Sequence, residues 1–248
     1  MAKQTFRNEG ISMKTKDATG QTVIVTGSNR GIGLGWVKHY LDAGDSVVAT
    51  CRTPAEATDL IALKEEYGNK LLIEQLDMSN EEHFDRLGEA LARYNVRIDI
   101  AINNAGSGSG KSFGEWDTES FAITFEVHTI GSALFAQMVT PLLNDGAKMV
   151  LTSSGVGSIT RANRQNEMDA YAIAKAGVNM LARRLSIRLA DRNIVVVALT
   201  PGAVLTGMNP NGTISVEESV GLMTSTLDKL TMDDSGSFLQ NNGTVVPW

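Results

Sequence analysis

The chain has 248 residues, of which 42% are hydrophobic and 20% charged, and its formal net charge is −6. This length suits one α/β domain or two small ones, and the acidic balance argues against a nucleic-acid-binding surface. The single cysteine, Cys51, excludes a disulfide within the chain and fits a reducing, cytoplasmic compartment, so we interpret it as a small buried apolar residue.

The first 20 residues are polar and lack the apolar core of a secretory signal. We therefore predict a flexible N-terminal arm followed by one domain over residues 21–248, because no proline- or glycine-rich linker divides the remainder. No apolar run reaches the roughly 18 residues of a membrane span. The three histidines lack the compact spacing of metal ligands, and no metal site is predicted.

Apolar runs of strand length alternate with helical patterns from residue 21 onward. Strands are predicted at 21–27, 45–51, 70–77, 97–106, 147–154 and 193–202, and helices at 32–43, 54–67, 80–94, 118–143 and 171–190. Strands rich in Val and Ile that alternate with helices predict βαβ units and an α/β fold with a doubly wound parallel sheet. The region 203–235 is less regular, and we expect a substrate lid at about 203–225, after the last of these strands.

The first predicted strand runs directly into a glycine-rich turn. Gly27 lets the chain turn sharply, whereas Gly31 and Gly33 remove side chains where a pyrophosphate approaches the backbone and the helix meets the sheet. The helix N-terminus then offers free N–H groups to phosphate. A loop that merely needs positive φ is the alternative, but the strand–turn–helix context favours dinucleotide binding. The contacts are expected from Gly27, Ser28, Asn29, Arg30, Gly31, Ile32 and Gly33.

Tyr171 and Lys175 lie four residues apart at the start of a predicted helix, and this spacing places both side chains on one helical face. A free phenol has a pKa of about 10. A neighbouring ammonium would stabilise the phenolate and lower that pKa, which would produce a general acid or base for neutral water. The pair also occurs by chance in helices, so its meaning depends on the surrounding motifs.

Four motifs in this order resemble the short-chain dehydrogenase/reductase family. They are the Gly-x-x-x-Gly-x-Gly turn, Ile102–Gly106 (INNAG), the Tyr171/Lys175 pair and Pro201-Gly202. The segment 235–248, with a glycine-flanked strand, a polar turn and Pro-Trp, is similar to sniffer-like carbonyl reductases and C-factor-like signalling proteins. The resemblance implies a homodimer or homotetramer formed through the helices at 118–143 and 171–190.

Cofactor preference is indicated at the end of the second strand, where an NAD-preferring enzyme usually carries an acid. Here the sequence 49–52 has no acid, and Arg52 with Arg30 could clamp a 2′-phosphate, although each could also be a solvated arginine. We therefore predict NADP(H). The resemblance adds Asp77, which could instead be a helix N-cap although Ser79 fits that position better. It also adds Asn104, Pro201, Gly202, Thr206, Tyr171 and Lys175 to the cofactor site.

The resemblance also implies catalytic residues. Ser154, at the end of the fifth strand, would hold the substrate carbonyl oxygen, and Ser153 and Ser158 are its rivals. Tyr171 would donate a proton, while Lys175 would depress its pKa and bind the nicotinamide ribose. His128 stands where the family usually carries asparagine, and it either joins a proton relay or substitutes sterically at a helix bend.

The pattern as a whole predicts an NADPH-dependent carbonyl reductase for a ketone, an aldehyde or a quinone-like molecule. The alternatives are an alcohol dehydrogenase working oxidatively and a cofactor-binding signalling protein with little turnover. No nucleic-acid or membrane partner is expected. Surface or packing positions are expected for His39 and His83, and a partly apolar pocket wall is expected from Met208, Pro210, Ile214 and Met223.

Overall fold

A computed structural model describes residues 20–107, 111, 113–163 and 168–248. Except for Gly20, the arm predicted at 1–20 lies outside the described residues, as do residues 164–167 of the segment before Tyr171.

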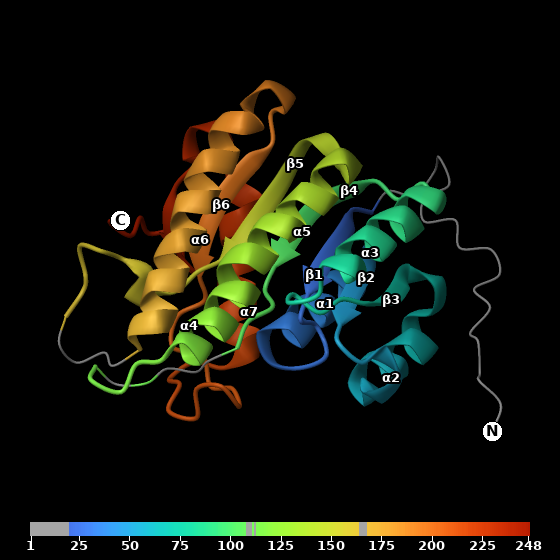
Figure 1. The fold of residues 1–248 in the computed structure, drawn as a ribbon. Helices are drawn as coiled ribbons and strands as arrows, with labels where there is room; N and C mark the ends of the chain where they lie inside the picture. Colours follow the sequence, from blue (N-terminus) through green and yellow to red (C-terminus); the bar gives the residue numbers. More distant parts are fainter. Residues whose placement is uncertain (1–19, 108–110, 112, 164–167) are drawn as a thin grey trace.

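Within the described residues, seven parallel strands form one sheet in the order β3-β2-β1-β4-β5-β6-β7 (Figure 1). The strand order reverses between β1 and β4, and ligands bind at the carboxyl ends of the strands beside such a switch point. The expected doubly wound parallel sheet is confirmed. The strands are β1 (Thr22–Thr26), β2 (Ser46–Cys51), β3 (Leu71–Gln75), β4 (Ile98–Asn103), β5 (Leu143–Thr152), β6 (Val195–Thr200) and β7 (Phe238–Gln240).

Helices cover both faces of the sheet, and each face has its own apolar core (Figure 1). On one face Trp36 and Val220 pack with Val25 of β1, and on the other Phe84 and Phe135 pack with sheet residues. The first face carries α1 (Gly31–Asp42), α2 (Thr58–Tyr67) and α7 (Val216–Lys229), and the second carries α3 (Glu81–Arg93), α5 (Gly131–Val139) and α6 (Asp169–Arg188), with α4 (Thr118–Phe125) packed against α6.

The helix predicted at 118–143 is divided in the structure. After α4, a π-helical turn covers Glu126–Ile130 and contains His128, and α5 begins only at Gly131. A 3₁₀ turn containing Pro141 then ends the helical segment, because proline cannot continue the backbone hydrogen bonding. Single π turns inside helices are frequent at functional sites.

The region predicted to be irregular, 203–235, contains the 14-residue helix α7. Its apolar face packs beside α1, and Met223 is only 2% exposed within that core. Met223 is therefore a core residue and does not form a pocket wall. Residues from Val216 onward are committed to this packing, and the substrate lid expected at about 203–225 stays a prediction.

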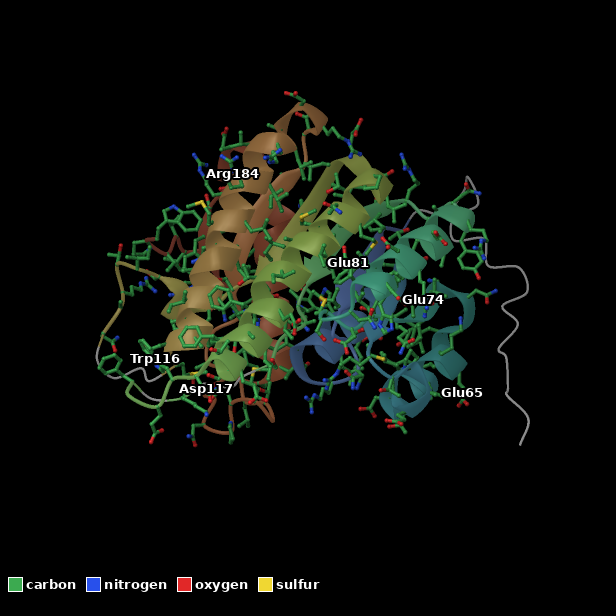
Figure 2. The ribbon with its side chains drawn as sticks, viewed as in Figure 1. Glu65, Glu74, Glu81, Trp116, Asp117 and Arg184 are labelled. Atoms are coloured by element: carbon green, nitrogen blue, oxygen red, sulfur yellow. The ribbon has the colours of Figure 1, made fainter. Side chains whose placement is uncertain are left out.

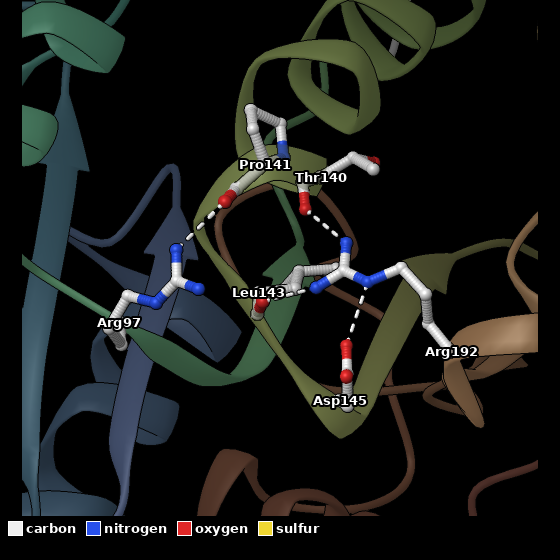
Figure 3. A network of polar contacts seen from close by, with 6 residues as sticks. All are labelled: Arg97, Thr140, Pro141, Leu143, Asp145 and Arg192. Atoms are coloured by element: carbon white, nitrogen blue, oxygen red, sulfur yellow. Dashed lines mark hydrogen bonds and ion pairs between the residues drawn. The ribbon is translucent and has the colours of Figure 1, made fainter.

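At the amino-terminal edge of the sheet, two arginines bind main-chain carbonyl groups around the start of β5 (Figure 3). Arg97 donates to the Pro141 oxygen at 3.0 Å, and Arg192 donates to the Thr140 oxygen at 2.9 Å. Arg192 also forms an ion pair with Asp145 at 2.8 Å. These contacts satisfy carbonyl groups at a helical end, and they hold the strand whose opposite end enters the candidate site.

Candidate active site

The glycine turn after β1 is shaped by close backbone approaches. Gly27 has φ +64°, and a Cβ atom there would lie 2.8 Å from the Ala105 Cα atom. A Cβ atom at Gly33 would lie 2.1 Å from the Gly27 oxygen. Since α1 begins at Gly31 and has no acidic residue in its first turn, its free N–H groups and partial positive charge suit an anionic pyrophosphate.

Polar groups from β1 and the end of β4 hold this turn in place. The hydroxyl oxygen of Thr26 accepts hydrogen bonds from the N–H groups of Asn104 at 3.0 Å and Ala105 at 2.9 Å. The Asn104 side chain donates to the main-chain oxygens of Thr26 at 3.0 Å and Gly27 at 3.2 Å. Asn104 therefore braces the turn from the neighbouring strand, and Thr26, which we had not predicted, shares this task.

The other residues predicted to bind cofactor in this turn differ in exposure. Ser28 is fully buried, and both its N–H group and its hydroxyl donate to the Thr50 oxygen, at 3.0 and 2.9 Å. Ile32 is partly buried against the core, whereas Asn29 and Arg30 are exposed. Ser28 thus stabilises the turn from within, and the exposed pair is free to contact a ligand.

Arg52 lies directly after β2 and is exposed, like Arg30. Neither guanidinium forms a salt bridge within the residues that the structure describes. The main-chain oxygen of Arg52 accepts a hydrogen bond from the Gln75 side chain at 2.8 Å, which fixes the backbone there. Two unpaired cations therefore flank the cradle, a charge distribution that suits an additional phosphate group.

Asp77 lies after β3 in a turn closed by side chains. Its carboxylate accepts hydrogen bonds from the Ser79 N–H group at 3.1 Å and hydroxyl at 2.8 Å, and its own N–H group donates to His83 Nδ1 at 3.1 Å. The α3 N-cap is Asn80, which accepts from the Glu82 N–H group. The expectation that Ser79 fits the N-cap is therefore wrong, because the helix begins one residue later, and His83 packs against the turn.

Ser154, Tyr171 and Lys175 come together where the end of β5 meets α6. The Ser154 side chain lies near enough to the Tyr171 hydroxyl to lower its pKa, and the Lys175 Nζ atom lies 5.5 Å from the centroid of the Tyr171 ring. Lys175 is buried and donates to the Thr152 oxygen at 2.7 Å. The structure thus brings together three residues that the sequence places in two separate segments.

The two rival serines are engaged elsewhere. Ser153 donates to the Asn179 side-chain oxygen at 2.6 Å, and Ser158 donates to the Pro247 oxygen at 2.6 Å. Asn179 also donates to the Gly157 oxygen at 3.1 Å and so supports the turn that follows Ser154. We had not predicted Asn179, although its place four residues after Lys175, on the same helical face, could have indicated it.

Burial is the largest cause of the pKa shifts of Tyr171 and Lys175. It raises the pKa of Tyr171, partly offset by the Ser154 hydrogen bond, and it lowers the pKa of Lys175 to about 7. The pKa of Tyr171 is therefore raised overall, because loss of hydration of the phenolate outweighs the effect of Ser154. That Lys175 depresses this pKa stays a prediction. The phenol stays protonated at neutral pH, as a proton donor must be.

His128 is buried between Tyr171 and the segment after β4. Its ring meets the Tyr171 ring edge-on, with centroids 5.1 Å apart and an interplanar angle of 83°. The Nε2 atom lies 2.6 Å from the Ser107 oxygen. Burial and the nearby charge of Lys175 lower the pKa of His128 to about 3. The imidazole is therefore neutral. Its Nε2 atom contacts both the oxygen and, at 3.3 Å, the N–H group of Ser107, and Nδ1 has no hydrogen-bond partner among the described residues.

The remaining INNAG residues make room for this arrangement. A Cβ atom at Gly106 would lie 2.6 Å from the His128 Cε1 atom, so only glycine allows the imidazole to approach. Asn103 donates to the Ser132 hydroxyl at 2.6 Å and accepts from Thr26 at 3.2 Å. Asn103 thus joins β4 to α5 and β1, and it supports the site without lining it.

The segment after β6 reaches across to the glycine turn. Gly202 has φ +85°, and the Pro201 oxygen accepts hydrogen bonds from the side chains of Ser219 at 2.8 Å and Asn241 at 3.0 Å. The Thr206 Cγ2 atom would be 3.7 Å from a Cβ atom placed at Gly31. Thr206 is therefore near the N-terminus of α1, and its contact with the cofactor stays a prediction.

Two further sequence interpretations concern residues away from the site. Cys51 is buried, and burial raises the pKa of its thiol, so its interpretation as an apolar packing residue is confirmed. His39 contacts the Tyr40 ring edge-on, with centroids 5.4 Å apart. Within the described ranges, no three His, Cys, Asp or Glu side chains are grouped to hold a metal ion, and no helix has the length and apolarity to cross a membrane.

Comparison with known proteins agrees with this geometry. The short chain dehydrogenase family model matches residues 21–215. Short chain dehydrogenase gsfK of Penicillium aethiopicum is 32% identical, with 92% of this chain and 99% of that protein covered. The C-signal protein of Myxococcus xanthus is 36% identical over 61% of this chain and 93% of its own length.

Solved structures of carbonyl reductases share the fold. NADPH-bound carbonyl reductase from chicken fatty liver has a TM-score of 0.87 and 30% identity, covering 92% of this chain and 94% of that one. Carbonyl reductase Sniffer of D. melanogaster has a TM-score of 0.86 and 27% identity, covering 92% and 100%. The chain therefore belongs to the short-chain dehydrogenase family of oxidoreductases.

Proposed function

We propose that this oxidoreductase reduces a ketone or an aldehyde with NADPH, and that Tyr171 is the proton donor. The observation that carries this assignment is the grouping of Ser154, Tyr171 and Lys175 at the carboxyl edge of the sheet, beside the glycine turn. The NADP(H)-bound relatives support the cofactor class. When bound in the glycine cradle, reduced nicotinamide supplies the hydride.

The side chains would divide the remaining work. The Ser154 hydroxyl holds the substrate oxygen by a hydrogen bond that strengthens as negative charge develops there. Tyr171 gives its phenolic proton to that oxygen. Lys175 binds ribose hydroxyls and supplies charge behind the phenol. In the reverse direction Tyr171 accepts the proton of an alcohol, so oxidation is the alternative use of the same groups.

Replacing Tyr171 with phenylalanine tests the proton donor. We expect Tyr171→Phe to lower kcat for carbonyl reduction by roughly 10²- to 10⁴-fold, the range contributed by general acid–base catalysis. NADPH oxidation with a panel of ketones and diketones measures it, and alcohol oxidation is assayed in parallel. The affinity of Tyr171→Phe for NADPH should equal that of wild type. Tyr94→Phe is the control, because it removes a phenol beyond α3, and its kcat should equal that of wild type. Wild-type turnover that survives Tyr171→Phe would contradict the assignment.

Arg52 tests the cofactor preference. We expect Arg52→Asp to raise KM for NADPH about tenfold or more while KM for NADH changes little, because a charge-assisted contact to phosphate is lost. Arg86→Asp serves as a control, since Arg86 is an exposed arginine on α3 that pairs with Glu82. Equal effects of Arg52→Asp on both cofactors would refute the phosphate clamp.

A cofactor-binding signalling protein is the second candidate, favoured by the similarity to C-signal and by His128 in place of the family asparagine. It predicts tight NADPH binding without oxidation by any carbonyl compound in the same panel. The intact group of Ser154, Tyr171 and Lys175 supports the enzyme instead.

We further propose a cytoplasmic homodimer or homotetramer. Ile173, Met180 and Ile187 recur every seven residues along α6 and are 48, 62 and 62% exposed. Ile123 of α4 and Ile130 of the π turn are 46 and 52% exposed. Because α4 packs against α6, an apolar surface on these helices supports association of subunits.

A further inference from the structure

Five large apolar side chains are exposed on the segments that follow β4, β5 and β6, and we name them the apolar rim. Because β4, β5 and β6 are adjacent and parallel, these segments meet at the same carboxyl edge as Ser154 and Tyr171. An exposed apolar patch of this kind marks a binding surface. The rim consists of Phe113, Trp116, Ile159, Leu205 and Met208, which are 81, 44, 77, 54 and 54% exposed.

Ile159, the rim residue after β5, lies between two residues whose positions are fixed by hydrogen bonds. Ser158 donates to the Pro247 oxygen at 2.6 Å, and Thr160 donates to the Trp248 oxygen from its N–H group at 2.8 Å and its hydroxyl at 2.6 Å. Ile159 lies between these two anchored residues. Its exposure therefore results from a fixed backbone.

The rim residues after β6 lie on a small hydrogen-bonded ribbon. The Leu205 N–H group donates to the Ile214 oxygen at 2.9 Å, and the Thr213 N–H group donates to the Ala203 oxygen at 2.7 Å. Thr206 and Asn209 close the tip by an isolated bridge. Leu205 and Met208 are therefore presented by backbone that is already ordered, which lowers the entropic cost of binding a ligand.

The rim residues before α4 form an aromatic series. The Phe113 and Trp116 rings are 5.0 Å apart at 78°, and the Trp116 and Phe121 rings are 5.6 Å apart at 75°. Figure 2 shows Trp116 beside Asp117 at the end of the molecule where α4 begins. Phe121 lies in α4, which packs against the helix that carries Tyr171. The indole is thus anchored edge-on and still partly open to a ligand.

Charge is sparse around the rim. Residues 201–216 contain no charged side chain, and Lys111 forms an ion pair with Asp117. Within the described part of the three segments, Glu115 and Arg161 are the charged residues left without a salt bridge. Among these described residues, Arg161 is therefore the one unpaired cation that a carboxylate or phosphate on the substrate would find.

We infer that the site takes an uncharged carbonyl compound with a bulky aromatic group, whose ring system contacts Trp116 and whose remaining apolar surface contacts Leu205 and Met208. The carbonyl group would then point toward Ser154 and Tyr171. This substrate class rests on the proposed reductase function. Contact with these residues removes apolar area from water on both partners, and this transfer favours binding in proportion to its extent.

Kinetics with matched substrates test the inference. The panel is a naphthyl methyl ketone, a short alkyl methyl ketone and a keto acid of similar length to the first. We expect wild type to favour the naphthyl ketone, and Trp116→Ala and Leu205→Ser each to lower its kcat/KM roughly tenfold, mainly through KM. The short ketone should change less than about twofold. Ile61→Ser, at an exposed isoleucine of α2, is the control.

A binding measurement separates this inference from the reductase proposal. The NADP-loaded protein is titrated with an uncharged naphthyl carbinol, and its Kd should rise in Trp116→Ala and Leu205→Ser. That result in the absence of any turnover would support the substrate class and reject the reductase. Three results would overturn the inference. The first is an equal loss of kcat/KM for the short and naphthyl ketones, and the second is a preference for the keto acid. The third is a change in oligomeric mass without a change in Kd.

Discussion

The His128 imidazole joins the segment after β4 to the tyrosine ring. It is 1% exposed, contacts the Ser107 backbone through Nε2, and meets Tyr171 edge-on. A neutral ring with a pKa of about 3 does not change charge between pH 5 and 8. We therefore propose that His128 positions Tyr171 and the Gly106–Ser107 backbone and does not relay protons.

Stability against pH tests the buried, neutral state of His128. Its folded-state pKa lies below the unfolded value of 6.5, so the unfolded chain binds the extra proton and stability falls as pH falls through this window. Between pH 6.5 and 5, wild type should lose about 2 kcal/mol more than His128→Asn. Urea unfolding at the two pH values measures this difference.

His39→Asn is the matched control for that measurement, and its loss should equal that of wild type. The pH profile of kcat separates positioning from a relay. An unchanged profile in His128→Asn agrees with positioning, whereas displacement of a limb between pH 5 and 8 would show that the imidazole transfers protons.

At the level of elements, the turn between β5 and α6 is held from both sides. Asn179 of α6 supports it from within, and the 247–248 main chain holds Ser158 and Thr160 from outside. Ser154 lies at the start of this turn. The geometry of the serine therefore depends on residues far away in the sequence, which explains why spacing to Tyr171 left three serines as candidates.

Removing the outer contacts should loosen the turn. We expect Ser158→Ala with Thr160→Val to cost about 1 kcal/mol of folding free energy per lost hydrogen bond and to raise KM for the carbonyl substrate, while NADPH affinity is unchanged. Amide hydrogen exchange over 155–161 should accelerate. Ser186→Ala, which removes a buried hydroxyl bonded to the Arg183 oxygen, should alter stability and leave KM unchanged. Unaltered exchange in the double variant would exclude this anchoring.

At the level of the whole molecule, the apolar surface of α4 and α6 predicts that subunits associate through these two helices. Ile173→Lys with Met180→Lys places two charges on that surface, and we expect dissociation to monomers because the buried charges would lack partners. Sedimentation equilibrium measures the mass, and circular dichroism checks that the fold persists. Leu222→Lys, at an exposed side chain of α7, is the control and should keep the oligomeric mass of wild type. An unchanged mass in the double variant would place any interface elsewhere.

The alternation of apolar runs was sufficient to predict the doubly wound parallel sheet, because strands buried on both faces must be apolar whatever they pack against. The glycine turn was equally readable, since only glycine tolerates its backbone approaches at Gly27 and Gly33. The π turn at His128 and the helix α7 could not be predicted from the sequence. Helix interruption and burial depend on neighbours from distant segments.

The protonation of Tyr171 and the hydrogen-bond partners of the three serines likewise depend on tertiary structure. Burial of Tyr171 reverses the expected direction of its pKa shift, because desolvation depends on every element packed around the ring. Ser153 and Ser158 differ from Ser154 in that their hydroxyls donate to Asn179 and Pro247. Local pattern thus determines which chemistry the chain can carry, and three-dimensional packing determines which atoms are free to perform it.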